Sequence, residues 1–79
     1  MSERQTIAEL EQTAEAAYAA MYDAKAHDVK DCYDDAQVHF GRAIEAAQLA
    51  RLPDEVARLW RRVEHITSVY NSQFRGVGR

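Results

Sequence analysis

The chain of 79 residues has little that would interrupt or cross-link a polypeptide, with one proline, three glycines and one cysteine. A single cysteine, Cys32, cannot form a disulfide within the chain, and this excludes a disulfide-rich secreted scaffold. Scarce proline and glycine, combined with abundant alanine, favour helix. Apolar residues make up 47% and charged residues 29% of the chain, which is typical of a folded globular domain.

Long apolar runs are also missing, and no segment approaches the roughly 20 residues that a membrane-spanning helix needs. Residues 1–12 are polar and lack the apolar centre of a secretory signal peptide. We therefore expect a cytoplasmic protein without membrane contact. The length predicts one domain over residues 1–79, with short flexible tails at 1–5 and 75–79.

Apolar residues recur at intervals of three and four over most of the chain, and this rhythm predicts an all-α fold. The helices are expected at about residues 6–26, 32–51 and 54–74, and the link at 27–31 either bends or breaks the first helix. Short links make neighbouring helices antiparallel. The prediction is a three-helix bundle, or a helical hairpin with a packed third helix.

Three local signals set the predicted helix boundaries. Thr6 followed by Glu9 has the spacing of a capping box for the first helix. Asp31 is a suitable N-cap for the second helix, because its carboxylate can accept from free backbone N–H groups. Pro53 fits the first turn of a helix and disfavours helical backbone at Leu52, which places the second break there.

The predicted core contains many alanines, which allow helix axes to approach closely but bury little area each. The core therefore depends on a few large residues, and Phe40 and Trp60 are the expected anchors. Because a small core leaves little margin, burial of further surface in a homodimer is a reasonable expectation.

One segment of the second helix carries an aromatic–small–aromatic–small–aliphatic pattern, formed by Tyr33, Ala36, Phe40, Ala43 and Ile44. This pattern resembles the second helix of a tetratricopeptide repeat. Three-helix microtubule-interacting-and-transport domains look similar in the same region. The resemblance implies a helical hairpin of similar packing and assigns no functional residue.

Charge is distributed unevenly along the chain, although the net charge is only −3. Residues 1–35 hold nine acidic and three basic side chains, whereas residues 36–79 hold four acidic and seven basic ones, all arginines. We expect the two halves of the fold to attract each other. An anionic partner for the second half is the alternative interpretation.

Four arginines of the second half are candidates for binding phosphates or another anionic ligand, namely Arg51, Arg58, Arg61 and Arg62. The sequence pI near 5.5 and the glutamates Glu55 and Glu64 among these arginines count against a nucleic-acid surface. Nucleic-acid binding is therefore the second interpretation.

The best candidate for a metal site is a set with helical spacing, Asp28, Cys32, Asp35 and His39. Helix capping explains its carboxylates equally well, and no established metal-binding motif is present. Cys32 and His39 lie about 10 Å apart along a helix, too far for a nucleophile pair, and His65 can approach only from another helix. We therefore expect no cofactor and no enzymatic activity.

The remaining class is a protein-interaction or structural module, in which grooves between helices receive partner helices. Candidate contact residues flank the main apolar stripes or lie off them. Gly41 belongs to this group because glycine in a helix costs about 1 kcal/mol relative to alanine, which suggests a close backbone approach. The candidates are Tyr18, Tyr22, Gly41, Leu49 and Leu52.

Overall fold

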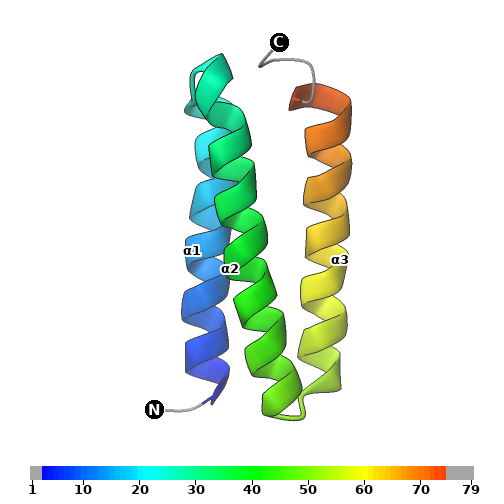
Figure 1. Cartoon of the computed structure of the whole chain (residues 1–79). Coiled ribbons are helices and arrows are strands. Elements are labelled where there is room, and N and C mark those ends of the chain that lie inside the picture. Colours follow the sequence, from blue (N-terminus) through cyan, green and yellow to red (C-terminus); the bar gives the residue numbers. More distant parts are fainter. Residues whose placement is uncertain (1–2, 75–79) are drawn as a thin grey trace.

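The computed structural model describes residues 3–74, which form three helices and, within that range, no strand (Figure 1). This confirms the predicted all-α three-helix bundle. A single 3-10 turn precedes the second helix, and a π-helical segment continues the third. The elements are α1 (Glu3–Asp23), the 3-10 turn (Ala26–Asp28), α2 (Val29–Leu49), α3 (Pro53–Val69) and the π-helical segment (Tyr70–Phe74).

Both predicted caps are wrong, because each helix begins earlier than the charge pattern suggests. α1 begins at Glu3, so Thr6 lies inside the helix. The flexible N-terminal tail predicted at 1–5 is helical over residues 3–5. The rest of the two predicted tails, residues 1–2 and 75–79, lies outside the described residues. The chain breaks at Lys25, whose backbone is extended at ψ 154°, and it re-enters helix at once. Asp31 therefore lies in the first turn of α2, and Asp28 occupies the N-cap position without a side-chain bond.

The end of α2 closes in a Schellman motif. Arg51 adopts a left-handed conformation with φ 57° and donates its backbone N–H to the carbonyl of Gln48 at 3.1 Å. Because α2 ends at Leu49, Arg51 lies outside the helix that was predicted to contain it. The N–H of Leu52 reaches back to the carbonyl of Ala47 at 3.0 Å. Pro53 then begins α3, as predicted.

The three helices are not equally close to one another. α1 and α2 pack along their length, whereas α3 stands further from α2 (Figure 1). Alanine explains the difference, because the α1–α2 contact is built on fully buried Ala14, Ala36, Ala43 and Ala47. α3 instead packs through larger side chains, which hold its axis further away.

Large side chains from all three helices fill the core around Phe40, which is 1% exposed. The largest fully buried side chains besides Phe40 are Ile7, Met21, Leu59 and Ile66. The prediction that Trp60 is a second anchor is wrong, because its surface is 49% exposed. Successive residues of a helix are rotated by about 100°, so the burial of Leu59 turns Trp60 away from the core.

Candidate protein-interaction surface

Arg58 on α3 holds two carboxylates, one on its own helix and one on α1. Its Nη1 and Nη2 groups donate to Glu11 at 2.6 and 2.8 Å, in the bidentate geometry that favours arginine. Its Nε group donates to Glu55 at 2.9 Å. This hydrogen bond lowers the pKa of Glu55 below its ordinary value.

Arg62 makes the same kind of connection one helical turn later. Its Nε and Nη2 groups donate to Glu15 at 2.5 and 2.8 Å, and these hydrogen bonds raise the pKa of Arg62. The guanidinium also lies 5.2 Å from the ring centre of Tyr18. Each of the two pairs between α1 and α3 joins residues 47 positions apart, which is the constant offset of two parallel helices.

These pairs show attraction between the acidic and basic halves of the chain. Arg58 and Arg62 both bind carboxylates on α1, although the side chain of Arg58 is 47% exposed. Two of the four candidate anion-binding arginines are thereby engaged within the fold. Arg51 and Arg61 are exposed and form no ion pair within residues 3–74.

Aromatic side chains hold the π-helical segment that follows α3 against α1 and α2. The hydroxyls of Tyr18 and Tyr22 lie 3.0 Å apart, and this hydrogen bond raises the pKa of Tyr18. The ring of Tyr22 meets that of Phe74 edge-on at 5.0 Å, and Tyr33 stacks on Tyr70 at 3.9 Å. Tyr18 and Tyr22, predicted as partner contacts, therefore make contacts within the chain, and Tyr22 still leaves 54% of its surface exposed.

A small polar network supports the same end of the bundle. Gln37 on α2 donates to the hydroxyl of Tyr33 at 2.8 Å and to Thr67 Oγ1 on α3 at 3.0 Å. The hydroxyl of Tyr33 lies 3.3 Å from the same Thr67 oxygen. These hydrogen bonds join α2 and α3 at this end of the bundle.

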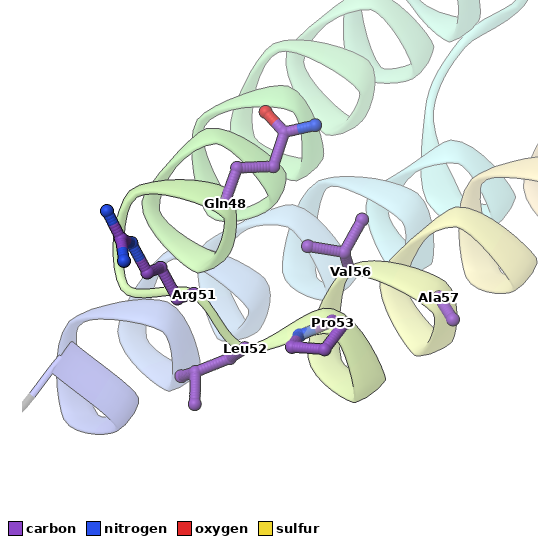
Figure 2. Close-up of a pocket in the computed structure, with 6 residues that line it drawn as sticks. All are labelled: Gln48, Arg51, Leu52, Pro53, Val56 and Ala57. Carbon is purple, nitrogen blue, oxygen red and sulfur yellow. The ribbon is translucent and has the colours of Figure 1, made fainter.

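At the other end of the bundle, the surface between α2 and α3 is hollowed. A hollow of about 330 Å³ lies where α2 ends and α3 begins (Figure 2). Apolar carbon from both helices and the intervening turn forms most of its wall, and Leu52 contributes to it, as does the side chain of Arg51. The lining residues are Gln48, Arg51, Leu52, Pro53, Val56 and Ala57.

Trp60 lies one turn further along α3, on the same side of the helix as Val56. Its half-exposed indole and the hollow therefore follow one another along a single face. We call this face, formed by Leu52, Pro53, Val56, Ala57 and Trp60, the α3 face. The apolar periodicity of α3 predicts a core position for Trp60 and so hides this face; the rotation of about 100° from Leu59 is the sequence signal that points to it.

The other predicted contact residues do not join the α3 face. Leu49 is 79% exposed and lines a second hollow of about 330 Å³ with Glu3, Thr6, Ala46 and Ala50, on the α1 side of α2. Gly41 is exposed on α2, and a Cβ built there meets nothing within 4 Å. The helix–helix contact expected at Gly41 is therefore absent among residues 3–74.

The candidate metal ligands do not form a cluster. Within residues 3–74, no three His, Cys, Asp or Glu side chains are placed to hold one metal ion. His39 Nδ1 lies 2.8 Å from the backbone carbonyl of Asp35, and Cys32 is half-buried as a free thiol. His65 lies exposed on α3.

No protein-family model, curated protein or solved structure matches this chain. The resemblance of the second helix to a tetratricopeptide repeat stays a prediction. In the part of the chain that the structure describes, no helix has the length and apolar character needed to cross a bilayer.

Proposed function

We propose that this chain is a non-enzymatic protein-interaction module that binds its partner through the α3 face. The observation that carries the proposal is the position of Trp60, half-exposed and one turn from an open apolar hollow. Tryptophan is enriched among the residues that dominate binding energy, and partner side chains that fill such hollows lose their contact with water.

The chemistry of the two described hollows supports binding rather than catalysis. The hollow at the α3 face contains one ionisable side chain, Arg51, and the hollow beside Leu49 contains one, Glu3. General acid–base or nucleophilic chemistry needs at least two groups with opposite roles within hydrogen-bond reach. Arg58 and Arg62 meanwhile bind carboxylates on α1, and this supports a role for them in the packing of α3.

Site-specific photo-crosslinking tests the proposal. The crosslinking residue p-benzoylphenylalanine replaces exposed Ala57 in the hollow, and a matched control carries it at exposed Ala16 on α1. After irradiation of cells that naturally make the chain, we expect a protein adduct of discrete mass at position 57 and none at position 16. Absence of any adduct at position 57, or equal labelling at both positions, would overturn the proposal.

A further inference from the structure

The α3 face carries apolar and charged groups in two parallel stripes. Pro53, Val56 and Trp60 recur at helical spacing and form the apolar stripe, beside the hollow. Asp54 and Arg61, seven residues or about two turns apart, form a second stripe along its edge. Both of these charged side chains are exposed, and neither has an ion pair within residues 3–74.

The charges are arranged symmetrically, with opposite signs, about one point on α3. Asp54 and Arg61 lie three and a half residues on either side of the midpoint between Ala57 and Arg58. Arg61 therefore has an acidic residue at its mirror position on α3, whereas the positions that mirror Arg58 and Arg62 hold Ala57 and Pro53.

The apolar residues of α3 are also distributed on both sides of this midpoint. Trp60 lies two and a half residues on one side of the midpoint. The α3 residues that line the hollow, Pro53, Val56 and Ala57, are centred about two residues on the other side. Trp60 and the α3 wall of the hollow therefore lie at similar distances on opposite sides of the midpoint.

We infer that the partner at the α3 face is a second copy of this chain, packed antiparallel about a two-fold axis through that midpoint. In a two-fold interface, a residue on one side of the axis meets its mirror position in the other copy. Trp60 of each copy enters the hollow of the other. Asp54 pairs with Arg61 of the second copy.

The size of this interface predicts a weak dimer. One aromatic side chain buries about 150–250 Å², and two tryptophans with the adjoining helix turns give a contact at or below the roughly 1,200 Å² lower limit of stable interfaces. We therefore expect a dissociation constant on the order of 1–100 μM. The inference rests on the proposed function, because it names the partner of the same face.

Charge swapping tests the register directly. Sedimentation equilibrium over about 1–500 μM should show reversible dimerisation of the unaltered chain, spanning the expected dissociation constant. Asp54→Arg or Arg61→Asp alone places like charges at both symmetric pairs and should weaken the dimer about tenfold. The double swap restores opposite signs in the same register and should recover most of the loss. The matched control is Arg42→Asp, on the exposed side of α2, which should leave the dimer unchanged.

Trp60→Ala provides a second test, because circular dichroism can confirm that the variant remains helical. We expect it to stay monomeric over the whole concentration range. A monomeric unaltered chain, or a dimer that ignores both single reversals, would overturn the inference. In either event, adducts of position 57 with a different protein would leave the proposed function standing, whereas no adducts would remove both.

Discussion

Arg62 on α3 and Glu15 on α1 share two hydrogen bonds, at 2.5 and 2.8 Å, although 47 residues separate them. Both side chains are about one third exposed. The pair stabilises the rotation at which α3 packs on α1, because its bidentate geometry favours one relative orientation of guanidinium and carboxylate. That rotation buries Leu59 and leaves Trp60 at the surface.

A double-mutant cycle with Arg62→Gln and Glu15→Gln should give a coupling energy of about 1 kcal/mol, measured by urea unfolding. The value should exceed that of an ordinary surface pair because the geometry is bidentate and partly buried. Lys30 and Asp34 supply the control, since they form an exposed pair within one helix at 2.9 Å. Equal coupling energies in the two cycles would contradict the stabilising role given to the Arg62 pair.

Acid should remove part of the connection made by Arg58. The hydrogen bond from Arg58 lowers the pKa of Glu55 in the folded state, so its contribution is present above the unfolded pKa and is lost as pH falls through the folded one. The difference in unfolding free energy between the unaltered chain and Arg58→Gln should therefore shrink as pH falls below about 4.5. Arg61→Gln is the control, and its difference should change less over the same range.

Gly41→Ala should stabilise the monomer by about 0.5–1 kcal/mol. Gly41 lies within α2, and the added methyl group meets open space. Thermal unfolding at low protein concentration measures the change. A loss of stability would show that the backbone at Gly41 is in a contact that residues 3–74 of one copy do not contain.

Arg51→Gly should stabilise the chain by about 1 kcal/mol, because a side chain in the left-handed conformation costs about 1–2 kcal/mol that glycine avoids. Arg51 holds this conformation at the Schellman turn, with φ 57°. Arg51→Ala is the matched control, since it removes the guanidinium but keeps the Cβ. If both variants gain equally, the side-chain charge rather than the backbone accounts for the effect.

The sequence carries enough information to predict the number and type of elements but not the rotation of the third helix. Periodic apolar residues and Pro53 place three helices and the second break, because these signals act locally. Whether a residue at the margin of an apolar stripe is buried depends on contacts with residues far away in the sequence. Local sequence patterns do not identify those contacts. Charge asymmetry predicted attraction between the halves, yet it could not reveal that Glu11 and Glu15 hold Arg58 and Arg62 in particular.

The N-cap predictions were also wrong, because the residue at which a helix begins depends on more than the chemistry of one side chain. Thr6 and Asp31 have the chemistry of N-caps, but the chain enters helix before each of them. Phe40 was predicted correctly as an anchor because it lies at the centre of its stripe, where small errors in rotation do not matter. Trp60 lies at the margin of its stripe, where a small error in the assumed rotation of the helix decides whether a residue is predicted to be buried or exposed.

The emission of Trp60 tests the central claim most directly, because the chain contains no other tryptophan. At low concentration, we expect acrylamide to quench this indole readily. As the concentration rises through the dissociation constant, the emission should shift to shorter wavelength and quenching should fall, and Asp54→Arg should need about tenfold higher concentration for the same change. An indole that is shielded at every dilution would place Trp60 in the core and contradict the account, as would an indole that is equally accessible at every concentration.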